Sequence, residues 1–230
     1  HSAIAMDDVH MAELEKLGKP AYLVIPNGWH ALDAARYQER YPDIKTICPP
    51  EAKSMLARKV DRIDGTYSDY ATLDEEGTVR LDLFEPERHM EGCMVVQSED
   101  GVTLVFGDSL FNLPHKPGSL WFVYGRLLGS TGGPKVTRIS RFMMFLTRSK
   151  CYFRDYLQGW AEEGQSTESK GGNKEERKSS TVVVRIVPGH GDVIDKDAPK
   201  VLDELASSLM ENAVGWYDRQ SARLHAAQSA

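Results

Sequence analysis

Two short apolar runs in this sequence each end in a polar residue beside glycine. Val102–Phe106 is followed by Asp108 within Gly-Asp, and Val182–Val187 is followed by His190 within Pro-Gly-His-Gly. Both runs are rich in β-branched residues and predict strands, so the polar residues lie on strand-end loops, where a rigid scaffold supports functional groups. A carboxylate and an imidazole together suit a divalent metal such as zinc.

The size and charge of the chain limit its class. Its 230 residues are enough for one large domain or two small ones, and we treat 1–230 as a single domain. A hydrophobic content of 41% allows a substantial core, and the formal net charge is −6. No basic stripe stands out, so we expect no nucleic-acid partner and instead a small-molecule substrate or ligand. The oligomeric state is left open.

The cysteines and the hydropathy pattern indicate the compartment. Cys48, Cys93 and Cys151 are odd in number, widely spaced and outside any C-x-x-C motif. This favours free thiols in a reducing compartment, so we expect a cytoplasmic protein. No apolar run reaches the roughly 18 residues of a membrane span, so we expect no membrane partner. The sequence begins at His1 rather than Met, which leaves open whether a segment precedes it.

The N-terminal part of the chain alternates between helical and strand patterns. Lys19–Ile25 is a near-continuous apolar run that predicts a strand buried on both faces. A helix over 7–17 is expected to turn Val9, Leu14 and Leu17 inward. This alternation predicts a parallel α/β unit. The other elements expected here are a helix at 30–40, a strand at Ile44–Cys48 and a short helix at 51–59.

The pattern then changes to antiparallel strands followed by helices. Thr78–Phe84, Cys93–Ser98 and Val102–Phe106 predict strands, with a hairpin turn at 99–101. Residues 164–180 are low in complexity and predict a disordered loop. The other expected elements are a largely helical segment at 137–163, a strand at 182–187 and an amphipathic helix at 197–214.

A cluster of large apolar residues lies within the predicted helical segment. Phe142, Met143, Phe145 and Leu146 recur at helical spacing. Such spacing favours a place in the hydrophobic core. The family resemblance described below implies an alternative, in which these residues form a roof over the pocket.

The order of motifs along the chain resembles the metallo-β-lactamase superfamily. That superfamily carries H-x-H-x-D-H after a buried strand, and the matching segment here is Gly28–Asp33. His30 takes the place of the second His. Gly28 and Leu32 stand where the motif has its first His and its Asp, and Asp33 stands where it has its last His.

Later motifs extend this resemblance over nearly the whole chain. Pro86–Gly92 loosely matches P-G-H-x-x-G, with one extra residue before His89. A strand that ends in G-D is matched at Asp108, and Pro188–Gly191 matches P-G-H-G fully. A narrower resemblance, to the uncharacterised DUF4336 branch of the superfamily, implies that opening strands normally precede this sequence. It is carried by His1–Ala5, Val24–His30 and Tyr41–Asp43.

The resemblance implies an α/β protein with a four-layer αββα sandwich and metal ligands on loops along one edge of its sheets. The expected ligands are His30, His89, Asp108 and His190. They would hold one divalent ion, zinc first, with manganese or iron as other candidates.

The implied function is a metal-dependent hydrolase with a mononuclear site. Two ions are not expected, because Gly28 and Leu32 carry no donor atom. Asp33 and Asp108 are the candidate catalytic bases, and Asp33 is otherwise a fifth metal donor or a partner for a metal-bound His. The substrate is unknown. A non-catalytic descendant that uses the fold for binding or assembly, without metal, is the alternative.

A second alternative is a GDSL-type serine esterase, because Gly-Asp-Ser-Leu occurs at 107–110. In that family Ser109 would be the nucleophile, activated by a His from a late D-x-x-H motif. The late part of this chain has no such motif, and its D-x-x-H lies at Asp7–His10. We therefore expect that Ser109 is not a nucleophile.

Overall fold

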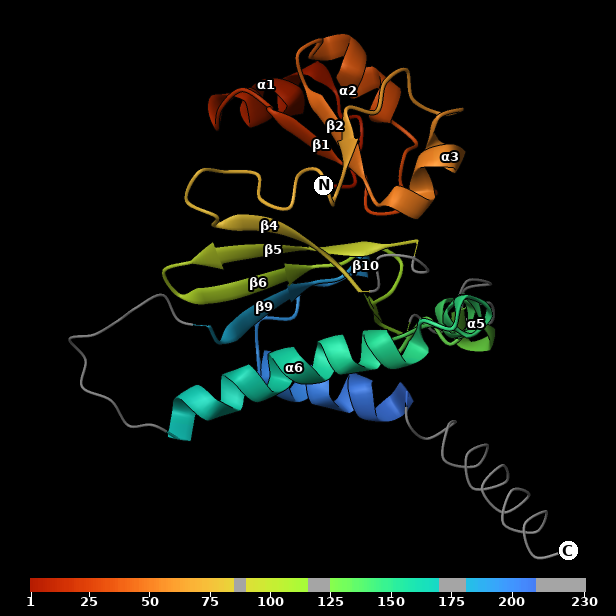
Figure 1. The fold of residues 1–230 in the computed structure, drawn as a ribbon, viewed down its shortest axis with the longest axis vertical. Helices are drawn as coiled ribbons and strands as arrows, with labels where there is room; N and C mark the ends of the chain where they lie inside the picture. The colour runs from red at the N-terminus through yellow and green to blue at the C-terminus, as the bar shows by residue number, and fades with distance from the viewer. Residues whose placement is uncertain (85–89, 116–124, 170–180, 210–230) are drawn as a thin grey trace, which may run out of the picture.

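The computed structural model describes residues 1–84, 90–115, 125–169 and 181–209. Its elements stack as helices, sheet, sheet and helices (Figure 1). This arrangement confirms the expected αββα sandwich. Within the described residues, no helix is both long enough and apolar enough to cross a membrane.

The first sheet is parallel and is covered by the N-terminal helices (Figure 1). Apolar β1 lies beside β2, and its Leu23 and Val24 are buried. Asp7 caps α1 by accepting a hydrogen bond from the His10 backbone N–H, which satisfies one of the otherwise unpaired N–H groups of the first turn. The elements are α1 (Asp8–Lys16), β1 (Tyr22–Val24), α2 (Ala34–Arg40), β2 (Lys45–Cys48), η1 (Pro50–Ala52), α3 (Lys53–Leu56) and β3 (Gly65–Thr66).

The second sheet has the order β4-β5-β6-β9. β4 to β6 form an antiparallel meander, whereas β9 joins β6 in parallel. Residues 101–104 of β6 are all buried, because the strand has a neighbour on each side and a layer on each face. The strands are β4 (Val79–Leu83), β5 (Gly92–Ser98), β6 (Gly101–Val105) and β9 (Val183–Val187).

A third, smaller sheet lies beyond the ends of β6 and β9. Its order is β10-β7-β8, from β7 (Phe111–Leu113), β8 (Gly133–Lys135) and β10 (His190–Gly191). β10 pairs in parallel with β7, with His190 opposite Phe111. This pairing fixes the backbone on either side of His190.

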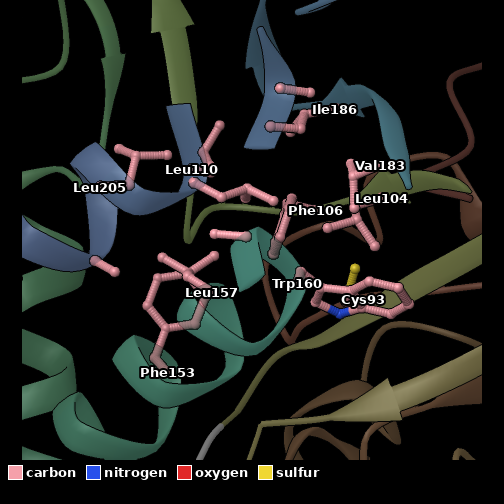
Figure 2. Packing of buried hydrophobic residues seen from close by; sticks show 14 of the residues in the cluster. Cys93, Leu104, Phe106, Leu110, Phe153, Leu157, Trp160, Val183, Ile186 and Leu205 are labelled. Atoms are coloured by element: carbon pink, nitrogen blue, oxygen red, sulfur yellow. The ribbon is translucent and has the colours of Figure 1, made fainter. Parts of the chain in front are cut away.

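The main core lies between the second sheet and the last helical layer. Figure 2 shows Phe153 and Leu157 of α6 (Lys150–Ser169) packed among Leu104, Phe106 and Leu205. Each large apolar side chain fully buried in this way contributes roughly 1.5–3 kcal/mol. Leu205 belongs to the helix at 198–209, which lies beside α6 (Figure 1).

A separate cluster joins the two larger sheets. Val24 and Ile47 of the first sheet pack with Tyr67 and with Leu81 of the second. The sheets therefore bury one face against each other and the other face under helices, as the four-layer architecture requires.

Several details differ from the sequence predictions. In α1 the buried residue is Met11, whereas Val9 and Leu17 are exposed, because the helix turns a different face toward β1. Residues 164–169 continue α6 rather than forming a disordered loop. A helix that has already formed extends without a new nucleation step, so a polar composition does not prevent these residues from continuing it. The rest of the predicted loop, 170–180, lies outside the described residues.

The central residues of the other predicted helices and strands have the secondary structure that the sequence predicts. The hairpin at 99–101, the parallel N-terminal strands and the strand after residue 181 are all present. The three cysteines are free thiols, as expected. The predicted helix at 197–214 is described as helical over 198–209.

Candidate metal centre

Three loops bring polar side chains together at the carboxyl ends of parallel strands. His30 follows β1, Asp108 follows β6, and His190 follows β9. β6 and β9 are adjacent and parallel, so their carboxyl ends meet at the same edge. Such edges are where open α/β sheets bind ligands.

These three side chains form one compact donor set. His30 Nε2 lies 3.0 Å from Asp108 Oδ1, and His190 Nε2 lies 3.2 Å from the same oxygen. One donor atom from each residue lies within 4.8 Å of the others. Of the four residues expected to meet at one site, the structure brings His30, Asp108 and His190 together, and His89 lies outside the described residues.

Glycines allow the two sequence motifs to approach this closely. A Cβ at Gly189 would lie 2.0 Å from the Gly107 carbonyl oxygen. Gly191 has a φ of +101°, and a Cβ there would lie 2.1 Å from the Asn112 carbonyl oxygen. Both positions therefore exclude a side chain. The glycines beside His190 bring its loop onto the loop that carries Asp108.

The Asp108 loop is held from beneath by a buried carboxylate. Glu91 accepts hydrogen bonds from the backbone N–H groups of Gly107, Asp108 and Ser109, at 3.0, 2.7 and 3.0 Å. Asn27 Nδ2 donates to Glu91 Oε2 at 3.0 Å and to Asp108 Oδ2 at 3.1 Å. Each Glu91 oxygen thus accepts two donors, an arrangement that suits an ionised carboxylate.

The sequence reasoning missed both Glu91 and Asn27. Asn27 stands in a Pro-Asn-Gly segment that reads as a turn, and its Oδ1 also accepts from the backbone N–H groups of Trp29 and His30. Glu91 lies next to the loosely matched P-G-H motif, but its partners are backbone groups 16 to 18 residues away. A sequence pattern carries no signal for such contacts.

The electrostatics of the donor set favour a charged aspartate. Burial raises the pKa of Asp108, but the hydrogen bonds with His190 and His30 outweigh it and hold that pKa well below its ordinary value. The bond with Asp108 raises the pKa of His30, although burial opposes this. Burial also raises the pKa of Glu91, against its hydrogen bonds with Ser109 and Asn27.

The other ring nitrogen of His30 also has a partner. Ser2 Oγ lies 2.8 Å from His30 Nδ1. A metal-bound His commonly uses its second nitrogen in this way, which fixes the tautomer and the ring orientation. Nε2 is then left for the donor set.

The donor set fits one divalent metal ion. Ligand atoms about 2 Å from a tetrahedral zinc lie roughly 3.3 Å apart, and the distances from Asp108 Oδ1 to the two imidazole nitrogens are close to this value. Three protein ligands with a fourth position open is the arrangement of catalytic zinc sites. The chemistry and the spacing of these residues therefore suit such an ion.

Asp33, the other predicted site residue that the structure describes, lies outside the donor set. Asp33 Oδ2 accepts a hydrogen bond from the Ala5 backbone N–H at 2.9 Å, so this carboxylate holds the N-terminal segment against α2. His89 lies outside the described residues. Leu32 is exposed, and a Cβ at Gly28 would lie 2.4 Å from Met55 Sδ, so Gly28 leaves room for that side chain.

The surroundings of Ser109 indicate a structural role. It is only 3% exposed, and its hydroxyl is hydrogen-bonded to Glu91. An activated serine needs a base and an accessible oxygen. This environment does not favour the GDSL-type interpretation.

A large cavity opens beside the donor set. Its volume is about 1130 Å³, and Asp108 and His190 are among the residues that line it. The walls are mostly apolar and include Trp29, Met90, Phe111, Leu113, Pro114, Leu128, Ile139, Met143 and Met144. Helix α5 (Arg138–Thr147) forms one wall and is anchored to the site, since Ser140 Oγ donates to the Asp108 carbonyl at 2.7 Å.

Comparisons with known proteins give structural likeness only. No family model and no curated protein matches this chain. The chain is similar to a crystal structure of DIM-1 metallo-β-lactamase exposed to ceftazidime, with a TM-score of 0.45, 15% identity and coverage of 87% of this chain and 74% of the other. A structure of TMB-1 has a TM-score of 0.44 and 12% identity, and another DIM-1 structure has 0.41 and 13%, both with the same coverage.

Proposed function

We propose that this protein is a metal-dependent hydrolase with one ion held by His30, Asp108 and His190. The observation that carries the proposal is the convergence of these donors from three separate chain segments beside a large cavity. When bound, such an ion lowers the pKa of a water ligand toward neutrality and polarises the oxygen of a scissile group. Zinc suits two imidazoles and a carboxylate, and manganese or iron are the other candidates.

The residues around the donor set hold its side chains in position. Asn27 holds Asp108 Oδ2 in place, and Ser2 orients the His30 ring. Of the two acids expected as the base, Asp108 is the one placed at the donor set, and we assign it as the acceptor of the proton that water loses. Asp33 has no such role in this proposal, because its carboxylate contacts Ala5.

The residues that line the cavity favour one class of substrate. Among the described residues that line the cavity, none is a Lys or an Arg, and the acids are Glu91, Asp108 and Asp192. A phosphoester or carboxylate substrate would bring its own negative charge and, besides the proposed ion, find no cationic side chain among these residues. We therefore propose an uncharged ester or amide with a bulky apolar group that lies along the α5 wall.

Our proposal also covers the superfamily, the number of domains and the location of the protein. Kinship with the metallo-β-lactamase superfamily, in a branch with a degenerate first motif such as the DUF4336 proteins, accounts for the order of the motifs. We also propose a single domain and a cytoplasmic location.

Hydrolysis of model esters by the zinc-loaded protein tests this function. We expect p-nitrophenyl decanoate to be cleaved with a higher kcat/KM than the acetate, and bis-p-nitrophenyl phosphate to be cleaved poorly. Activity should disappear in H190A and persist in H10A, a variant of an exposed histidine that pairs with Asp7 outside the site. Equal activity in H190A would refute the assignment.

One observation favours the non-catalytic alternative. The hydrogen bonds of Asp108 with His30, His190 and Asn27 satisfy the cluster without an ion. In that case the protein binds a small apolar molecule and catalyses no reaction. A protein that binds decanoate esters but leaves them intact at every metal tested would support this alternative.

A further inference from the structure

Helix α5 presents a second apolar face, most of which lies outside the cavity lining. Ile139, Phe142, Phe145 and Leu146 are 54%, 58%, 71% and 57% exposed. We call these four residues the α5 face. Their spacing places them on one side of the helix, while Ser140, Met143, Met144 and Thr147 of the other side line the cavity. The core position expected for Phe142, Phe145 and Leu146 is therefore wrong.

The α5 face is larger than scattered surface residues would explain. Single exposed apolar residues are ordinary, whereas a contiguous group with two phenylalanines marks a contact surface. Leu127, just before the helix, and Tyr152, just after it, are also large and exposed. Figure 1 shows α5 at the margin of the molecule, beyond the end of α6.

The charge of the chain segment that carries this face is one-sided. Residues 109–154 contain eight of the 28 Lys and Arg residues of the chain and none of its 34 Asp and Glu residues. Arg126, Arg138 and Arg148 of this segment are exposed. The interpretation that no basic stripe stands out is wrong for residues 109–154. The net charge of the whole chain does not reveal this basic segment, because the rest of the chain is acidic.

We propose that the α5 face docks onto an anionic phospholipid bilayer. An amphipathic helix with large apolar side chains on one face and arginines beside them lies in the bilayer interface, with its apolar face among the acyl chains. Exposed arginines next to it are attracted to negatively charged lipid headgroups. The expectation of no membrane partner followed from the absence of a spanning segment, which surface docking does not need.

Docking would also place the cavity against the lipid. Ile139 belongs to the α5 face and also lines the cavity, so the two adjoin along this helix. An apolar molecule dissolved in the bilayer could then enter without crossing water. This consequence rests on the proposed function, whereas the docking itself does not.

Vesicle sedimentation with the full chain tests the docking. The probes are phosphatidylcholine vesicles with and without about 30% phosphatidylserine. We expect binding to the anionic vesicles, and weaker binding at high salt. The double variant F142S/F145S should lower the partition coefficient at least about tenfold, because two large side chains no longer enter the apolar layer.

The matched control is V9S/L17S, which removes two exposed apolar side chains, one from the acid-rich helix α1 and one from its C-cap. It should bind vesicles like the parent chain. R126Q/R148Q should weaken binding to anionic vesicles by about fivefold per charge. Thermal melting shows whether each variant is folded.

Two results would overturn the proposal. One is equal sedimentation of the parent chain and F142S/F145S. The other is self-association of the parent chain that F142S/F145S abolishes, with no vesicle binding, which would assign the α5 face to a second copy of the chain. Neither result depends on whether the protein binds metal or hydrolyses an ester.

Discussion

Gly189 packs directly against the carbonyl group of Gly107, so the loop before His190 touches the loop before Asp108. The two motifs that stand out in the sequence are thus in backbone contact. Any side chain at Gly189 would push these loops apart.

G189A should destabilise the protein by roughly 1–3 kcal/mol, because the clash is with backbone that has no rotamer to change. It should also lower metal affinity, since the His190 and Asp108 side chains separate. Urea denaturation and metal titration measure the two effects. G159A, in the middle of α6 with open space around its Cα, is the control and should be neutral or stabilising. A neutral G189A would contradict the close packing of the two loops.

E91Q should cost roughly 1–3 kcal/mol of unfolding free energy. The amide replaces one acceptor oxygen with donors, so backbone N–H groups of the Asp108 loop lose their partner while buried. Chemical denaturation provides the measurement, with E204Q as an exposed control on the helix at 198–209. Equal stability of the two variants would mean that the buried carboxylate does not support the loop.

S2A should weaken metal binding about 10-fold to 100-fold while the fold is kept. Loss of the group that holds Nδ1 of a metal-bound imidazole has this effect in other metal sites. A competition titration with a zinc-binding dye gives the affinity. Unchanged affinity would show that Ser2 does not orient His30.

Zinc affinity should fall as the pH is lowered. Asp108 raises the pKa of His30, so the metal-free site keeps a proton on this ring to a higher pH than a free imidazole does. Binding must displace that proton, and each displaced proton weakens affinity about tenfold per pH unit below its pKa. Titrations at about pH 6, 7 and 8 cover the range in which imidazoles titrate. An affinity that is constant across this range would exclude His30 as a ligand.

Local patterns were enough to predict much of the fold and part of the site. The strands before Asp108 and His190 follow from their β-branched runs, and the glycines beside them indicate functional loops. The strand–helix alternation predicts the parallel unit and the later strands predict the antiparallel meander, whereas the four-layer arrangement was implied by the resemblance of the motifs. These features depend on residues close together in sequence.

The missed features depend on contacts between distant residues. Glu91 is functional only because three backbone N–H groups of another loop surround it. Phe142 and Phe145 have the spacing of core residues, and only the packing of α5 shows which helix face is inward. In α1, likewise, only the packing of the helix shows that Val9 is exposed and Met11 is buried.

The most direct test of the central claim is the metal content of the purified protein. Inductively coupled plasma mass spectrometry after incubation with zinc should give one ion per chain. The reason is that His30, Asp108 and His190 offer one set of donors, whereas Gly28 and Leu32 offer none. H190A should retain the fold and lose the ion. Two ions per chain, or none with zinc, manganese or iron, would contradict the mononuclear site.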